Sequence, residues 1–190
     1  MRVISGKFKG RPLVSFQADN IRPTTDRVKE TLFNKLMGQV EAARVLDLFS
    51  GTGNLAIECI SRGAGWVDLV ESHKKSLAII RENFTLLKIT DGYKIFPIDA
   101  FKFIDAFRGE PYDLVIADPP FTQSWAHDLC LKAGESRILK AGGVFVIEAS
   151  SKERMEESYP GLIRLDQRTF GDKNLNFFER ENHGQSNISR

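Results

Sequence analysis

Four consecutive residues, Asp118-Pro119-Pro120-Phe121, combine a carboxylate, two prolines and an aromatic ring directly after the apolar run 112–117. Proline lacks a backbone N–H and fixes its own φ, so two in succession end a strand and hold the neighbouring carbonyls in a stiff loop. Such a loop can present hydrogen-bond acceptors to the amino group of a substrate. The same tetrapeptide can also be a simple strand-ending turn, and taken alone it leaves both interpretations open.

A second stretch, 45–53, reads Val-Leu-Asp-Leu-Phe-Ser-Gly-Thr-Gly and predicts a strand that ends in a glycine-rich turn. Gly51 and Gly53 permit positive φ and let a ligand lie against bare backbone. Asp47 lies inside the predicted strand, where a carboxylate is unusual. The stretch therefore indicates a cofactor-binding turn.

Carboxylates also close the next two predicted strands. Glu71 is suited to hold a ribose diol by two hydrogen bonds, and Asp99 places a further acceptor along the same edge. Ligands in open α/β sheets bind at the carboxyl ends of the strands. We therefore expect Asp47, Glu71 and Asp99 to contribute to one site.

Two cofactors fit this pattern. The spacing Gly51-x-Gly53-x-x-Ala56, with Glu71 about 20 residues further on, also satisfies the dinucleotide fingerprint. A pyrophosphate, however, prefers an uncluttered helix amino terminus. An acid just upstream of the turn, as Asp47 is, better suits the ammonium and sulfonium of S-adenosylmethionine. We favour this methyl donor, because Asp99 could accept a hydrogen bond from its adenine amino group. A nicotinamide dinucleotide is kept as the alternative.

Alternating strand-like and helix-like runs after Arg44 predict βαβ units and a parallel sheet that would position these residues. Strands are predicted at 45–49, 66–71, 93–99, 112–118 and 144–149, and helices at 54–62, 74–88, 101–107 and 124–138. A polar stretch at 151–157 predicts another helix. The segments 162–170 and 174–178 predict a final antiparallel pair of strands.

The first 40 residues differ from the rest in pattern and charge. Residues 1–15 predict a short β-ribbon, and a helix capped by Thr24 or Thr25, with Asp26 in its first turn, is predicted to reach Gly38. This part carries eight basic and three acidic side chains, whereas the whole chain has a net charge of only +2. A basic end predicts a polyanionic partner such as nucleic acid. A solvated basic face is the alternative.

The composition excludes several classes of protein. With 190 residues, 42% hydrophobic and 27% charged, the chain fits one globular domain with a small appendage and is neither disordered nor fibrous. It lacks a secretory signal and an apolar run of about 20 residues, so we expect a cytoplasmic protein without membrane contact. Cys59 and Cys130 lack the spacing of metal ligands and are expected to be buried.

The order of these motifs resembles that of class I S-adenosylmethionine-dependent methyltransferases that modify exocyclic amino groups. Residues 2–11 and 21–33 are similar to those of the bacterial RsmD family, the small-subunit ribosomal RNA guanine-N2 methyltransferases. The resemblance implies a Rossmann-like α/β sheet, mostly parallel, with an antiparallel C-terminal hairpin. It implies a β-ribbon and helix extension at 1–40 that contacts RNA and a methyltransferase domain at 41–180. The segment 181–190 is polar and nearly devoid of apolar residues, so we expect it to be disordered.

The resemblance also assigns roles to individual residues. The expected catalytic residues are Asp118, Pro119, Pro120 and Phe121. The expected S-adenosylmethionine-binding residues are Thr25, Asp47, Phe49, Ser50, Gly51, Gly53, Glu71, Ser72, Asp99, Ala100 and Asp118. The expected RNA-binding residues are Lys7, Lys9, Arg11, Arg22 and Arg27. The implied partner is ribosomal RNA within the small subunit or an assembly intermediate, bound by a monomer that needs no metal.

The implied reaction methylates the N2 amine of guanine 966 in 16S ribosomal RNA and leaves S-adenosylhomocysteine. Asp118 and the Pro119 carbonyl would accept the amino hydrogens while Phe121 stacks on a flipped or unpaired base. Adenine-modifying relatives usually have Asn where this chain has Asp118, which agrees with guanine. The alternatives are an adenine-N6 or cytosine-N4 methyltransferase on RNA or DNA, a non-catalytic ribosome assembly protein, and an NAD-linked oxidoreductase. The segment 170–174 departs from the family pattern and leaves its substrate contacts open.

Overall fold

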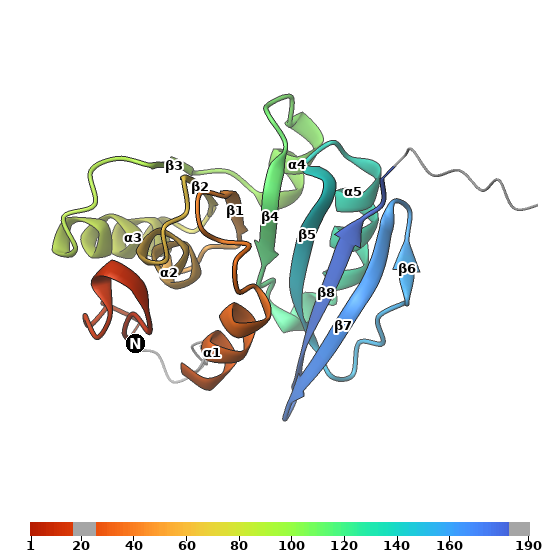
Figure 1. The fold of residues 1–190 in the computed structure, drawn as a ribbon, viewed down its shortest axis with the longest axis horizontal. Coiled ribbons are helices and arrows are strands. Elements are labelled where there is room, and N and C mark those ends of the chain that lie inside the picture. The colour runs from red at the N-terminus through yellow and green to blue at the C-terminus, as the bar shows by residue number, and fades with distance from the viewer. Residues whose placement is uncertain (17–25, 183–190) are drawn as a thin grey trace, which may run out of the picture. The chain divides into compact units, whose positions relative to one another are not determined.

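The computed structural model describes residues 1–16 and 26–182. Arg22, Thr24 and Thr25, and nearly all of the tail predicted at 181–190, lie outside the described residues. The chain divides into two compact units, Met1–Phe103 and Ile104–Arg190 (Figure 1). Helix α4 spans the boundary in sequence.

Parallel strands form the sheet of the first unit, in the order β3-β2-β1. Helices α2 and α3 connect them, as expected for βαβ units. In α3 the apolar residues Leu77, Ile80 and Phe84 recur at three- and four-residue spacing and are buried, which explains why this segment is a helix. The strands are β1 (Arg44–Leu48), β2 (Trp66–Val70) and β3 (Tyr93–Phe96), and the helices are α2 (Asn54–Ser61), α3 (Lys74–Leu86) and α4 (Ala100–Ala106).

Residues 1–13 form an arch that packs on α2. The N–H of Val3 donates to the carbonyl of Arg11, and a 3-10 turn, η1 (Gly6–Phe8), closes the arch. The predicted β-ribbon is therefore reduced to an isolated bridge, Arg2 with Pro12, because the 3-10 turn curls the chain away from strand geometry. Helix α1 (Asp26–Lys35) follows, with Val28, Leu32 and Phe33 on its buried face.

The second unit contains five strands in the order β4-β5-β8-β7-β6. Strands β4 and β5 are parallel, and the remaining pairs are antiparallel. Parallel strands followed by an antiparallel C-terminal hairpin confirm the predicted Rossmann-like α/β fold. The elements are β4 (Tyr112–Ala117), η2 (Phe121–Gln123), α5 (Ala126–Glu135), β5 (Leu139–Ser150), β6 (Ser158–Tyr159), β7 (Leu162–Phe170) and β8 (Lys173–Arg180).

The helix predicted at 151–157 is wrong. This segment consists of turns and irregular chain, and its Glu153 carboxylate accepts hydrogen bonds from the backbone N–H groups of Ala126 and His127. Glu153 thus caps the amino end of α5, where negative charge is favourable. Polar spacing suggested a helix, but the segment instead stabilises the start of another helix.

Two further sequence expectations concern the cysteines and membrane-spanning segments. Cys59 and Cys130 are buried and free, as expected from their spacing. Across residues 1–16 and 26–182, no helix has the length and apolar character needed to cross a bilayer.

Candidate cofactor site and catalytic loop

Asp47 lies beneath the glycine turn of the first unit and is almost completely buried. Its Oδ2 accepts a hydrogen bond from the Ala56 N–H at 3.1 Å, in the first turn of α2. Its Oδ1 is buried and has no hydrogen-bond partner among the described residues. A buried acceptor without a donor is costly. The site therefore fits a ligand that brings a donor or a positive charge.

Burial raises the pKa of Asp47 to about 7, and the nearby Glu71 charge adds to this effect. Hydrogen bonds from Ala56 and Ser50 act in the opposite direction. A cationic ligand would stabilise the ionised carboxylate. The ammonium of S-adenosylmethionine has the charge that this environment favours.

The turn after β1 has an unusual backbone conformation. Phe49, Gly51 and Gly53 all have positive φ, at 59°, 55° and 77°. The Ser50 hydroxyl donates to the Asp47 carbonyl oxygen at 2.7 Å and fixes the start of the turn. A Cβ at Gly53 would lie 3.3 Å from Ile80. The glycine there thus serves both the conformation and the packing of α3.

Glu71 directly follows β2, and its carboxylate joins the neighbouring turn. Oε2 accepts a hydrogen bond from the Gly51 N–H at 2.8 Å, and Oε1 accepts one from the His73 N–H at 2.7 Å. Glu71 thus lies beside the glycine turn, and its role toward a ribose stays a prediction. Ser72, between them in sequence, is exposed.

Asp99 lies beyond the strand that was predicted to end with it. Strand β3 ends at Phe96, because the Ile98 N–H bonds back to the Phe96 carbonyl and turns the chain. Asp99 Oδ1 accepts from the Lys102 N–H at 3.0 Å and caps α4, which begins at the buried Ala100. The predicted strand end at 99 is therefore wrong, although the acid still lies between β3 and α4.

An aromatic contact links this loop to the glycine turn. The rings of Phe49 and Phe101 meet edge to face, with centroids 6.4 Å apart. One set of contacts thus joins three segments that were predicted to form the cofactor site. These are the turn at 49–53, Glu71 and the start of α4. Asp47 is joined to the helix that follows the turn, because its carboxylate accepts a hydrogen bond from Ala56 of α2.

The predicted catalytic loop belongs to the second unit. Strand β4 ends at Ala117, so Asp118 and Pro119 emerge directly from it, and η2 begins at Phe121. Pro119 is buried and Pro120 is exposed. The structure thus places a stiff proline loop where the sequence predicted it.

Two residues that the sequence did not single out contact this loop. The buried Glu148 of β5 lies beside Asp118, because Ile147 pairs with Ala117, and it forms an ion pair with Lys173 of β8. The Lys173 ammonium also lies 4.8 Å from the centroid of the Phe121 ring. An acid inside the apolar run 144–149 was the signal that could have found Glu148.

The predicted RNA contacts that the structure describes lie on the surface of the first unit. Lys7, Lys9, Arg11 and Arg27 are exposed, and the Lys7 ammonium lies over the Phe8 ring. Exposed cations of this kind can contact phosphates.

The buried contacts that hold the N-terminal arch, which carries Lys7, Lys9 and Arg11, were not predicted from the sequence. The buried Glu58 accepts hydrogen bonds from the N–H groups of Ile4 and Ser5 at 2.9 and 3.0 Å and pairs with Lys29. The Lys29 ammonium in turn donates to the Arg2 carbonyl at 2.7 Å. These buried groups hold the N-terminal arch against α1 and α2.

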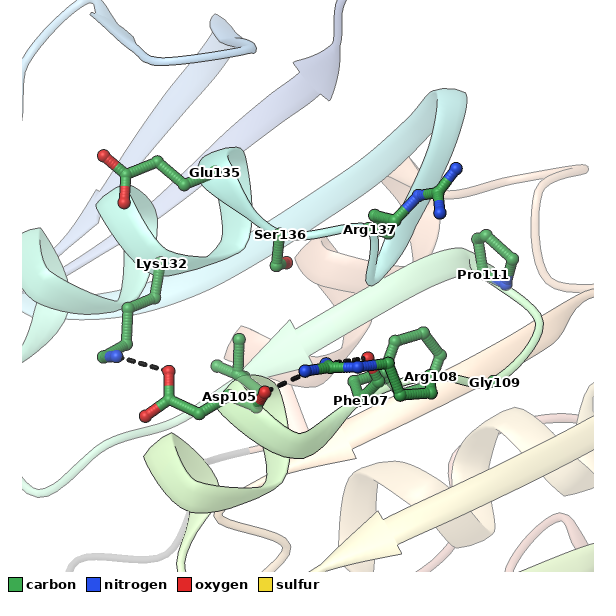
Figure 2. A pocket seen from close by; sticks show the side chains of 10 residues that line it. Asp105, Phe107, Arg108, Gly109, Pro111, Lys132, Glu135, Ser136 and Arg137 are labelled. Carbon is green, nitrogen blue, oxygen red and sulfur yellow. Dashed lines mark hydrogen bonds and ion pairs between the residues drawn. The ribbon is translucent and has the colours of Figure 1, made fainter.

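A pocket of about 690 Å³ lies elsewhere in the second unit (Figure 2). An ion pair between Lys132 and Asp105 lies on its wall, and Arg108 and Arg137 add positive charge. Among the predicted site residues that the structure describes, none lines this pocket.

Comparisons with known proteins give one family. A family model described as Conserved hypothetical protein 95 matches residues 1–179. Ribosomal RNA small subunit methyltransferase D of Escherichia coli (strain K12) is 28% identical over 186 residues, covering 98% of this chain and 93% of that protein. The protein of the same name from Buchnera aphidicola subsp. Acyrthosiphon pisum is 32% identical over 151 residues, covering 80% and 78%. The solved structure of yhhF from Escherichia coli has a TM-score of 0.84 at 28% identity, covering 95% and 98%.

Proposed function

Because the chain belongs to the family described as Conserved hypothetical protein 95, the RsmD family that its sequence resembles, we propose that it methylates ribosomal RNA of the small subunit. The proposed methyl donor is S-adenosylmethionine, and the proposed acceptor is the N2 amine of a guanine, at position 966 of 16S RNA by the family resemblance. The observation that carries the proposal is the open acceptor of the buried Asp47 beneath a glycine turn that is joined to Glu71.

The first unit supplies the donor site. Asp47 has the charge to balance the ammonium of the cofactor, and Glu71 can exchange its bond with Gly51 for the ribose hydroxyls. Asp99 offers its remaining acceptor oxygen to the adenine amino group. S-adenosylmethionine, when bound, supplies an electrophilic methyl group on a sulfonium.

The second unit supplies the acceptor loop. The Asp118 carboxylate and the Pro119 carbonyl accept the two hydrogens of the N2 amine and turn the nitrogen lone pair outward. Phe121 stacks on the base and fixes its plane. The amine loses one proton as it gains the methyl group, and Asp118 can accept that proton. Orientation of this kind is worth roughly 7–11 kcal/mol in well-aligned cases.

RNA binding is assigned to the exposed cations Lys7, Lys9, Arg11 and Arg27. Contacts to phosphates give affinity and salt dependence without sequence choice. A guanine inside a helix cannot place its amine against the proline loop, so the target base must be unpaired or flipped.

The experiment that tests the proposal supplies labelled S-adenosylmethionine together with naked 16S RNA or with unmodified small subunits. The RNA is then digested and its nucleosides are identified by mass spectrometry. We expect N2-methylguanosine, and mapping of the modified base identifies the nucleotide. Label in N6-methyladenosine or N4-methylcytidine would establish a different amino-group specificity. Absence of label in every substrate would contradict the enzymatic proposal.

A further inference from the structure

Glu148 is a buried acid that the reaction as described does not use. It lies near the carboxyl end of β5, between Ile147 and Ala149, and only 3% of its surface is exposed. Transfer of an ionised carboxylate to such an environment is costly unless partners compensate for it. The contacts of Glu148 therefore indicate what it does.

Its partners come from two other elements. Asp118 directly follows β4, and Ala117 before it pairs with Ile147 in the parallel register, so Asp118 and Glu148 lie side by side. Two ionised carboxylates have only acceptor atoms, so a hydrogen bond between these neighbours requires one shared proton. Lys173, at the start of β8, forms an ion pair with Glu148. These are the two charged groups that face Glu148 among the described residues of this unit.

Lys173 connects the same pair to the aromatic side of the loop. Its ammonium lies 4.8 Å from the centroid of the Phe121 ring, within the range of a cation–π interaction. The register of the hairpin fixes the lysine there, because Lys173 pairs with Ser150 at the end of β5. One side chain thus holds Glu148 and also faces the ring assigned to stack on the base.

We propose that Glu148 and Lys173 are positioning residues for the proline loop: Glu148 shares one proton with Asp118 and fixes its carboxylate, while Lys173 holds both Glu148 and Phe121. The inference rests on the proposed role of Asp118. In the active state Glu148 carries the proton and donates to one oxygen of Asp118. The other oxygen of Asp118 is then ionised and oriented to accept from the substrate amine.

The electrostatics of the pair agree with a shared proton. Burial, followed by the neighbouring Asp118 charge, raises the pKa of Glu148 to about 7, and Lys173 opposes this rise. Above that pH both carboxyls are ionised, and a single lysine charge faces two like charges. The hydrogen bond that orients Asp118 is then lost.

A pH profile of single-turnover methylation tests this arrangement. We expect the wild-type rate to fall by about tenfold as the pH rises from 6 to 8.5. Glu148→Gln places a permanent N–H donor against Asp118, so its rate stays within about threefold of wild type at pH 6 and does not fall at higher pH. Glu157→Gln, an exposed acid paired with Arg164, is the matched control and keeps the wild-type profile. A fall of equal size in Glu148→Gln would overturn the proposal.

Lys173→Met tests the other contact. We expect the rate at pH 6 to drop by about 10- to 100-fold, because both Glu148 and Phe121 lose their anchor. The affinity for S-adenosylmethionine should remain within about twofold. Lys140→Met, which removes an ion pair with Asp113 in the same unit, is the control and keeps its rate. An unchanged rate in Lys173→Met would contradict the role assigned to the lysine.

A measurement that does not depend on activity separates this inference from the proposed function. Carbon-13 titration of the Glu148 carboxyl, assigned with Glu148→Gln, should give a midpoint near pH 7 in the wild type. The midpoint should fall in Asp118→Asn, which removes the like charge, and rise in Lys173→Met. These shifts in a protein that methylates nothing would support the carboxyl pair and contradict the proposed function. Unchanged midpoints in an active enzyme would contradict the pair alone.

Discussion

The carboxylate of Glu71 accepts a hydrogen bond from the backbone N–H of Gly51 at 2.8 Å. The acid that follows β2 is thereby joined to the glycine turn that follows β1. Two segments separated by 20 residues in sequence meet because parallel strands end at the same edge of the sheet. In the proposed function, this contact is the place where the ribose of the cofactor binds.

Glu71→Ala should weaken cofactor binding. Hydrogen bonds to a charged group contribute about 1.5–3 kcal/mol, so we expect the Kd for S-adenosylmethionine to rise by about 10- to 100-fold. Isothermal titration calorimetry measures this change. Glu82→Ala, an exposed acid on α3, is the matched control. A Kd for Glu71→Ala that equals that of the control would rule out the ribose role.

Asp47 makes stability depend on pH in the absence of cofactor. Its folded pKa of about 7 lies above the unfolded value of 3.8, so the folded state binds the proton more tightly. The stabilisation from this proton is complete below the unfolded pKa and is lost as the pH rises through about 7.

Asp47→Asn removes this dependence. Relative to wild type, the variant should therefore gain stability as the pH rises from 5 to 8, by on the order of 2 kcal/mol. Urea unfolding at the two pH values gives the comparison. The same variant should bind S-adenosylmethionine poorly, because the charge that faces the ammonium is gone. A stability difference that does not change with pH would show that Asp47 does not titrate in this range.

Gly6→Ala should detach the N-terminal arch. Gly6 has a φ of 79°, and a Cβ there would lie 1.8 Å from the Ser61 carbonyl oxygen, so the backbone must move. Gly10→Ala is a matched control, since its φ is 80° but its Cβ would meet nothing within 4 Å. We expect Gly6→Ala to cost about 2 kcal/mol more than Gly10→Ala in unfolding free energy. Equal costs would mean that the arch does not depend on this contact.

Charge reversal on the arch should weaken RNA binding and leave cofactor affinity intact. In Lys7→Glu with Lys9→Glu, filter binding to 16S RNA should lose affinity, and the slope of log K against log salt should flatten by about 1–2. The control reverses Lys74 and Lys75, which are exposed at the start of α3. If both pairs of substitutions behaved alike, the arch would have no special part in RNA binding.

The sequence was sufficient to predict the elements that carry the site. Strong apolar periodicity placed α3, and the breaks after the apolar runs placed the glycine turn and the proline loop. The meeting of Glu71 with Gly51 followed from strand order alone. These features depend on local patterns and on the general geometry of parallel sheets.

Contacts that depend on register could not be predicted in the same way. Glu148 and Lys173 are 25 residues apart, and their ion pair exists because β5 and β8 are antiparallel in one particular register. The strand that was expected to reach Asp99 ends at Phe96, since a local turn competes with the sheet. Local composition does not specify either outcome.

The central claim, that the proline loop performs methyl transfer to a guanine amine, is tested most directly with Asp118→Ala. Wild type and variant are incubated with labelled S-adenosylmethionine and unmodified small-subunit RNA, and N2-methylguanosine is quantified by mass spectrometry. Calorimetry on the same samples reports cofactor affinity. We predict that the variant forms no detectable N2-methylguanosine while its cofactor affinity stays within about twofold of wild type. Formation of N2-methylguanosine by Asp118→Ala at the wild-type rate would contradict the account.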